Sequence, residues 1–333
     1  MSLMLRLLMF GLVMAVVLTG SARADYSQRE DVRAYVAELV AEHGFAAEEL
    51  SELFAQAERK QTILDAIARP AERTLKWHEY RDIFIEEPRI AQGLEFWDTH
   101  AAVLEAAEAR FGVAPEYVVA ILGVETRYGR ITGGYRVLDA LVTLGFDYPP
   151  RAAFFRRELT EFLLLAREEG YNPLELTGSY AGAMGYGQFI PSSFRNYAVD
   201  FDGDGLRDIW SNPQDAVGSI ANYFSRHGWQ AGEDVVLQVQ VDSDGADGIA
   251  NESLDLTHTV ADLKRLGVAL DGLPAEQPVA LFRMEGQDGD EYWVGLNNFH
   301  VITRYNRSRL YALAVHQLGQ SIKSRRQALM VER

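Results

Sequence analysis

The sequence predicts a mainly α-helical protein of the α+β class, with one small β-rich insertion toward its C-terminal end. Apolar residues recur at three- and four-residue spacing up to about Trp229, which is the pattern of amphipathic helices. Alternating segments such as VVLQVQVDS appear only after that point. A composition of 48% hydrophobic and 24% charged residues is globular rather than disordered.

Residues 1–24 have the pattern of a signal peptide. A basic start at Arg6 is followed by an apolar run over residues 7–18 and an A-x-A cleavage pattern that ends at Ala24. The alternative is an uncleaved membrane anchor, but a span needs about 20 apolar residues. We therefore expect export to the periplasm, with the fold beginning after the cleavage site.

The chain contains no cysteine, and its formal net charge is −16. Without cysteine there can be no disulfide, no cysteine–zinc site and no lipid-modified N-terminal cysteine. The acidic charge argues against nucleic acids and anionic membranes as partners. These observations predict a soluble exported protein that is not a lipoprotein.

The helical patterns fall into two blocks. The segments VRAYVAELVAEHGF, SELFAQAERKQTILDAIARP and FWDTHAAVLEAAEARFG predict an N-terminal helical domain over residues 25–112. In residues 113–232, helices such as PEYVVAILGVETRYG and RAAFFRRELTEFLLLAREEG alternate with glycine-rich breaks. NPQDAVGSIANYFSRHGW starts another helix, with Asn212 as its cap.

The helical pattern then gives way to a β-rich one. VVLQVQVDS, PVALFRMEG and EYWVGLNNFHVITRYN read as strand-like, and the turn signals SDGADG and GQDGDE separate them. Helix returns in SRLYALAVHQLGQSIKS. We therefore expect a β-rich domain over residues 233–299, inserted into a core made of residues 113–232 and 300–333.

Glu125 is the most distinctive carboxyl of the helical core. It follows the apolar stretch 118–124 and precedes a glycine-rich turn at 129–134. Apolar walls disfavour a charged carboxylate and raise its pKa, so such a group can act as a general acid. The alternative is a structural glutamate neutralised by Arg127, by Arg130 or by backbone donors, and the local pattern alone favours this structural role.

Three longer sequence blocks help to decide between a catalytic and a structural role for Glu125. They are GVETRYG, SYAGAMGYGQFIPSSFRNYAVDFDGDG and NNFHVITRYNRSRLYALAVHQLG. In this order and at these separations, they resemble the lytic murein transglycosylase B family, glycoside hydrolase family 103. The resemblance covers most of the chain after residue 24. It implies a lysozyme-like core, peptidoglycan as substrate, and Glu125 as the lone catalytic glutamate. We also expect a monomer.

The resemblance implies further residues in the cleft. Ser179 matches the serine that orients the acetamido group of the substrate, although it could instead be a turn residue that bonds its own backbone. Cleft-lining positions, the last two on weaker grounds, are matched by Met184, Gln188, Tyr223, Tyr305, Asn306, Tyr311, Tyr80 and Arg151. Tyr223 and Tyr311 lie on expected helices, so core packing is their alternative role.

The reaction type follows from the single obvious carboxylate. Most glycosidases pair an acid with a second carboxylate, and none stands beside Glu125 in GVETRYGR. In the resembling family the acetamido group of the substrate takes the missing role, and the glutamate acts as acid and then as base to form 1,6-anhydromuramyl ends. The alternatives are a hydrolytic muramidase and a non-catalytic, calcium-dependent peptidoglycan-binding protein.

The motif DFDGDGLRD resembles the start of an EF-hand calcium loop. The ligands expected at its odd-numbered positions are Asp200, Asp202, Asp204, Leu206 (through its carbonyl) and Asp208. Position 12 is Ser211 rather than glutamate, and the family resemblance implies a longer loop, 200–215, that Asp215 closes. The alternative is an Asp/Gly surface turn. We expect a structural Ca²⁺ ion and no organic cofactor.

Overall fold

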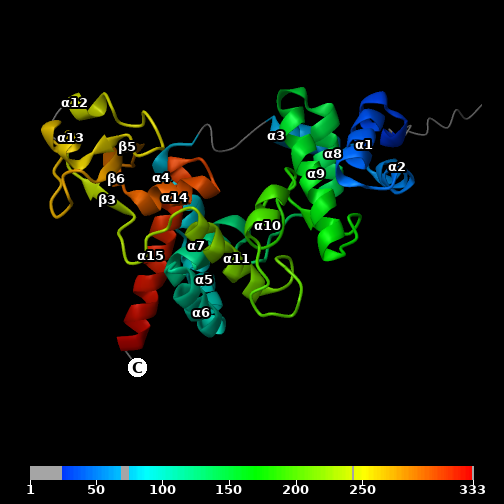
Figure 1. Ribbon diagram of the computed structural model, residues 1–333. Coiled ribbons are helices and arrows are strands. Elements are labelled where there is room, and N and C mark those ends of the chain that lie inside the picture. Colours follow the sequence, from blue (N-terminus) through cyan, green and yellow to red (C-terminus); the bar gives the residue numbers. More distant parts are fainter. Residues whose placement is uncertain (1–24, 69–74, 242–243, 332–333) are drawn as a thin grey trace, which may run out of the picture.

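The computed structural model describes residues 25–68, 75–241 and 244–331 (Figure 1). The expected signal peptide, residues 1–24, lies outside these ranges. Within them, no helix combines the length and the apolar character that a membrane crossing requires.

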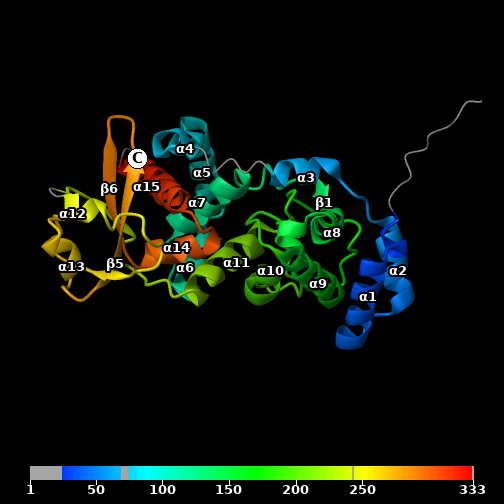
Figure 2. The same cartoon turned by 90° about the horizontal axis from the view of Figure 1, so that it is seen from above.

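One end of the molecule is a helical group that joins the start of the described chain to its middle (Figures 1 and 2). Its members are α1 (Glu30–His43), α2 (Ala47–Gln56), α3 (Gln61–Ile67), α8 (Val137–Asp147) and α9 (Ala152–Glu169). Tyr35 of α1 donates a hydrogen bond to the Arg156 carbonyl of α9 at 3.1 Å. Phe54 of α2 meets the Phe146 ring of α8 edge-on, with centroids 6.5 Å apart.

A second helical group surrounds α7 in the middle of the molecule. Its members are α4 (Trp77–Phe84), α5 (Glu87–Thr99), α6 (Ala101–Phe111), α7 (Pro115–Thr126), α11 (Pro213–Arg226), α14 (Asn297–Tyr305) and α15 (Arg309–Val331). Ten of the twelve residues of α7 are buried, so it is the central helix. The long helix α15 packs along it and approaches closely at Gly319, where a Cβ atom would lie 2.9 Å from the Glu116 carbonyl oxygen.

The helices within residues 25–112 fall into two groups by their packing, and the division of the chain into domains stays a prediction. The helix α3 packs on α8, while α1 contacts α9 through Tyr35 and α2 contacts α8 through Phe54. In contrast, α4–α6 pack with α7, α11 and α15. The reason is that each short helix buries its apolar stripe against a longer helix from another part of the chain. Periodicity identified the helices correctly but could not show which partner each one has.

The opposite end is a four-stranded antiparallel sheet of order β3-β6-β5-β4 (Figure 1). Its strands are β3 (Val236–Val239), β4 (His258–Thr259), β5 (Pro278–Glu285) and β6 (Asp290–Gly295), and it carries the short helices α12 (Asp244–Asp247) and α13 (Val260–Arg265). Leu281 and Val294 bury one face in a small core of its own. Phe282 on the other face packs on Phe299 of α14, with ring centroids 5.0 Å apart.

The four strands of this sheet lie within residues 233–299, where the sequence predicted β structure. One detail was wrong: EYWVGLNNFHVITRYN does not remain extended, because β6 ends at Gly295 and α14 begins at Asn297. The fully buried Asn298 explains the change. Its side chain accepts from the Gln230 N–H at 2.8 Å and donates to the Gln230 carbonyl at 2.8 Å, which fixes the chain where the sheet meets the helices.

Shorter elements lie before α1 and between the longer helices. They are η1 (Tyr26–Gln28), β1 (Tyr135–Arg136), η3 (Pro149–Arg151), β2 (Thr177–Gly178) and α10 (Pro191–Tyr197). β1 and β2 pair antiparallel. The glycine-rich segment 178–190 follows β2, and it is this segment that reaches the end of α7.

Asp139 on α8 accepts hydrogen bonds that help to hold the first helical group together. Its carboxylate is 1% exposed and accepts hydrogen bonds from the Glu58 N–H and from Arg136, each at 2.8 Å. Asp139→Ala leaves these donors without their acceptor, so we predict a loss of about 2 kcal/mol or more in the free energy of unfolding. Urea denaturation measures it. Glu38→Ala, an exposed mid-helix control, should change it by less than about 0.5 kcal/mol, and equal losses would contradict this role of Asp139.

Candidate active site around Glu125

Glu125 lies half-buried in the last turn of α7. The helix ends directly after it, because Arg127 and Tyr128 both adopt left-handed backbone conformations with φ of 52° and 60°. Two consecutive residues other than glycine in this region are strained, and such strain is typical of functional sites. The carboxyl is therefore presented by a rigid, buried helix at a sharp exit of the chain.

Thr126 fastens the glycine-rich segment to this helix end. Its hydroxyl donates to the Tyr186 carbonyl at 2.7 Å and accepts from the Gly129 N–H at 3.0 Å. Gly129 has φ +82°, and a Cβ there would lie 2.0 Å from the Tyr186 ring, so only glycine fits. The motifs GVETRYG and SYAGAMGYGQF therefore meet in space.

Tyr311 of α15 donates a hydrogen bond to Glu125 Oε1 at 2.6 Å. The tyrosine is 2% exposed, and its pKa is raised well above the usual value by burial and then by the negative charge of Glu125. Its hydroxyl consequently stays protonated at neutral pH and acts as a donor. A helix near the C-terminus thus holds the orientation of the carboxyl.

Tyr305 of α14 is a second tyrosine near Glu125. Burial, followed by the charge of Glu125, raises the pKa of the Tyr305 hydroxyl, which donates to the Gly187 carbonyl at 2.5 Å. A Cβ at Gly187 would lie 2.8 Å from this hydroxyl. The close approach explains why the sequence has glycine there.

The arginines near Glu125 in the sequence form their ion pairs with α5. Arg127 lies 3.3 Å from Glu86 and donates to Gln92 at 2.7 Å. Arg130 pairs with Glu95 at 3.0 Å. These contacts tie the chain that follows Glu125 to α5 and to Glu86, the residue just before it.

Two more tyrosines of the expected cleft lie near Tyr305 and Tyr311. Tyr223 of α11 meets the Tyr305 ring edge-on, with centroids 4.8 Å apart, and donates to the Arg304 carbonyl at 2.6 Å. Tyr80 of α4 is close enough to contribute to the raised pKa of Tyr311. Tyr223 is 7% and Tyr80 is 3% exposed, so both support the residues around Glu125 more than they offer surface.

Ser179 has the turn geometry considered as its alternative role. Its hydroxyl oxygen accepts from the Ala181 N–H at 3.2 Å and from the Ala183 N–H at 3.0 Å. A serine hydroxyl also carries one proton to donate. The two accepted bonds fix the oxygen, so that proton can be directed to a ligand.

The structure corrects the exposure expected of Met184. Its side chain is fully buried, and its backbone exchanges hydrogen bonds with Phe189 at 2.9 and 3.0 Å. It therefore shapes the loop from within and does not form its surface. Gln188, with φ +50°, is half-buried, and its amide donates to the Thr132 and Gly185 carbonyls at 3.1 and 2.9 Å.

Asn306 and Arg151 lie apart from each other. Asn306 is half-buried at the C-terminus of α14, next to Tyr305. Arg151 lies at the start of α9, exposed, with its guanidinium 4.4 Å from the Phe154 ring centroid. The structure thus places Asn306 beside the Glu125 cluster and Arg151 in the other helical group.

The DFDGDG loop follows α10 and leads into α11. Its first three aspartates, Asp200, Asp202 and Asp204, bring one carboxylate oxygen each within 4.8 Å of one another. The fully buried Asp215 accepts from the Phe201 and Asp208 N–H groups at 2.7 and 2.8 Å, so it fastens both halves of the loop.

The other ligands expected in the loop do not belong to this cluster of three carboxylates. Asp208 accepts from the Trp210 and Ser211 N–H groups, both at 2.9 Å. Leu206 is exposed and donates its own N–H to Asp204 at 2.9 Å. Three carboxylates in one place suit a hard cation that prefers oxygen ligands, and Asp208, Leu206 and Asp215 remain predicted ligands.

Sequence reasoning missed Thr126 and Tyr186. Both stand inside the quoted motifs, and Thr126 follows Glu125 directly. Their role is a hydrogen bond across 60 residues of sequence. No local pattern reports such a pairing, although a polar residue next to the key carboxyl was a signal.

Residues 27–320 match the family model described as "Transglycosylase SLT domain". The chain is 42% identical to the membrane-bound lytic murein transglycosylase B of Escherichia coli (strain K12) over 309 residues, covering 90% of this chain and 84% of the relative. It is similar to the catenated lytic transglycosylase SltB1 of Pseudomonas aeruginosa, with 55% identity, a TM-score of 0.88 and coverage of 91% and 100%.

A further solved structure is the lytic transglycosylase Slt35 of Escherichia coli in complex with calcium, with 41% identity, a TM-score of 0.83 and coverage of 91% and 95%. These likenesses confirm the predicted mainly α, lysozyme-like fold with its small β-rich part. The chain belongs to the lytic murein transglycosylase B family, whose members carry the transglycosylase SLT domain.

Proposed function

We propose that the protein is a lytic transglycosylase that cleaves the β-1,4 bond between N-acetylmuramic acid and N-acetylglucosamine in peptidoglycan. The observation that carries this proposal is Glu125, half-buried at the end of α7 and hydrogen-bonded by the neutral Tyr311. Family membership supports the same reaction.

Glu125 acts first as the acid and then as the base. It protonates the glycosidic oxygen as the bond to C1 of the muramyl residue breaks. The acetamido oxygen of that residue stabilises the cationic carbon. Glu125, now a carboxylate, takes the proton from the C6 hydroxyl while that oxygen bonds to C1, which gives a 1,6-anhydromuramyl end without consuming water.

Other residues position the glycan for this step. Ser179, with its oxygen fixed by two backbone N–H groups, directs its proton to the acetamido carbonyl. Tyr305, Asn306 and Gln188 line the cleft beside Glu125. That lining is held in place by buried residues, namely Tyr223, Tyr80, Tyr311 and Met184. Arg151 offers a cation to the carboxylates of the muropeptide.

We propose a structural Ca²⁺ ion in the loop 200–215. The carboxylates of Asp200, Asp202 and Asp204 form the centre of its oxygen donors, while the Leu206 carbonyl, Asp208 and Asp215 belong to the wider set. The calcium complex of Slt35 supports this assignment. Held there, the ion would offset the repulsion of these carboxylates and would stiffen the loop before α11, which carries Tyr223.

We also propose that the protein works as a monomer in the periplasm, to which residues 1–24 direct it. The substrate is peptidoglycan, and we propose neither nucleic acid partners nor an organic cofactor. The basis is the pattern of the leader and the acidic composition of the chain.

Glu125→Gln removes the transferable proton and keeps the shape of the side chain. We predict that solubilisation of purified sacculi falls by roughly 10³-fold, while the melting temperature stays close to that of the unchanged protein. Turbidity loss of sacculi and thermal unfolding measure the two effects. Glu105→Gln, an exposed position on α6, is the matched control and should retain activity; a folded Glu125→Gln protein that remains active would contradict the mechanism.

Tyr311→Phe removes only the donor to Glu125. Because the carboxyl loses its orientation, we predict that kcat falls by about 10- to 100-fold and that KM changes by less than about threefold. Tyr292→Phe is the matched control, since Tyr292 also donates to a carboxylate, Asp247, at 2.8 Å but lies in the β-rich region. Steady-state kinetics on soluble glycan strands distinguishes the two, and equal kcat values for both variants would refute the orienting role of Tyr311.

Calcium binding is tested by its effect on unfolding. We predict that millimolar Ca²⁺ raises the melting temperature by several degrees, because a ligand that binds only the folded state stabilises it by mass action. Asp202→Asn should abolish most of this rise, whereas Asp98→Asn on α5 should keep it. A chain whose melting temperature is insensitive to Ca²⁺ would rule out the site.

A further inference from the structure

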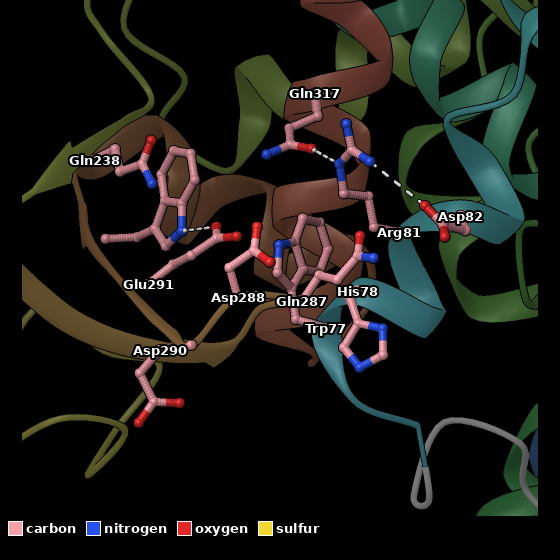
Figure 3. A pocket seen from close by; sticks show the side chains of 12 residues that line it. Trp77, His78, Arg81, Asp82, Gln238, Gln287, Asp288, Asp290, Glu291 and Gln317 are labelled. Atoms are coloured by element: carbon pink, nitrogen blue, oxygen red, sulfur yellow. Dashed lines mark hydrogen bonds and ion pairs between the residues drawn. The ribbon is translucent and has the colours of Figure 1, made fainter.

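A cavity that Glu125 does not line lies between α4, the β5–β6 hairpin and α15. It has a volume of about 480 Å³, and Figure 3 shows side chains from all of these elements pointing into it. Arg81 of α4 donates to Gln317 of α15 at 2.8 Å, and both side chains line the cavity. Gln287 and Asp288, in the turn between β5 and β6, line it as well.

The first signal in this cavity is an unsatisfied donor. Trp77, the first residue of α4, is 1% exposed, and its Nε1 atom has no hydrogen-bond partner in the described part of the chain. Figure 3 shows the nitrogen-bearing edge of this indole turned toward Asp288 and the cavity. Buried donors are nearly always paired, so this one calls for an acceptor supplied from outside the protein.

The second signal is charge. One arginine and four carboxylates line the cavity: Arg81, Asp82, Asp288, Asp290 and Glu291. Arg81 already lies 3.4 Å from Asp82, and Asp290 lies 3.8 Å from Arg283 of β5. Asp288 stands exposed at the tip of the hairpin. The surplus of negative charge suits a cationic group of a ligand.

A ligand that meets both needs carries an acceptor and a cation close together. The ammonium and carboxylate of an amino-acid group have this chemistry, with the ammonium placed at Asp288 and Glu291 and the carboxylate oxygen at the Trp77 N–H. Sugar stacking fits less well, because Trp77 is 1% and Trp293 is 8% exposed, so neither presents an open ring face.

The cavity shares its helices with the groups around Glu125. Trp77 and Tyr80 lie three residues apart on α4, which places them on one side of the helix. Gln317 follows Tyr311 by six residues on α15, a rise of about 9 Å. The cavity is therefore built partly on the two helices that also carry Tyr80 and Tyr311.

We propose that this cavity binds the free amino-acid end of a diamino residue in a peptidoglycan stem peptide. The proposal rests on the proposed function for its source of ligand, but the site itself is defined by Trp77, Asp288 and Glu291. It would hold a stem peptide while the attached glycan strand occupies the cleft at Glu125.

Calorimetric titration with the sugar-free tripeptide L-alanyl-γ-D-glutamyl-meso-diaminopimelate tests the site directly. We expect binding, weakened about tenfold when the free amine of the peptide is acetylated and about two- to fivefold by Asp288→Asn. Trp77→Phe, which removes the N–H and keeps a ring, should also weaken it, with thermal unfolding as the check on folding. Asp271→Asn, an exposed aspartate elsewhere in the β-rich region, is the matched control and should bind normally.

Two outcomes would overturn the proposal: no binding of the tripeptide, or equal affinity in Asp288→Asn and the unchanged protein. Equal binding of free diaminopimelate and the tripeptide would place recognition in the amino-acid group alone, as the geometry predicts. Cleavage of peptide-free glycan strands is measured in parallel. Asp288→Asn should leave it intact, so failure of the peptide site and failure of the transglycosylase function give different results.

Discussion

The hydrogen bond from Tyr311 to Glu125 joins two parts of the chain that are 186 residues apart. A carboxyl at the end of an apolar helix needs a polar partner, because an unpaired buried polar group is costly. Here the partner is a buried hydroxyl whose pKa is raised, so it donates at neutral pH. This neutral hydroxyl orients Glu125 by a hydrogen bond and adds no positive charge of its own.

The packing of the surrounding helices and loops positions Glu125 and Tyr311. The helix α7 is buried on nearly all sides, and α15 lies against it closely enough to require glycine at position 319. Thr126 then fastens the glycine-rich loop to the end of α7, and Tyr305 fastens the same loop at Gly187. Strained backbone at Arg127 and Tyr128 is tolerated because these contacts over-determine it.

Much of this could be predicted from the sequence, because periodicity and turn residues act locally. The helices, the β-rich insertion and the meeting of the motifs around Glu125 follow from such patterns and from the family resemblance. The partners of α1–α3, the burial of Met184 and the end of β6 at Gly295 could not be predicted, since each depends on residues far away in the sequence. The same applies to Asp215, whose two backbone hydrogen bonds only the folded loop reveals.

We propose that Glu125 transfers a proton in both steps and that the C6 hydroxyl, not water, attacks C1. Digestion of purified sacculi in water enriched in oxygen-18, followed by mass spectrometry of the muropeptides, tests this most directly. We predict 1,6-anhydromuramyl ends that carry no label. Reducing muramyl ends that contain one oxygen-18 atom would contradict it and would identify a hydrolytic muramidase.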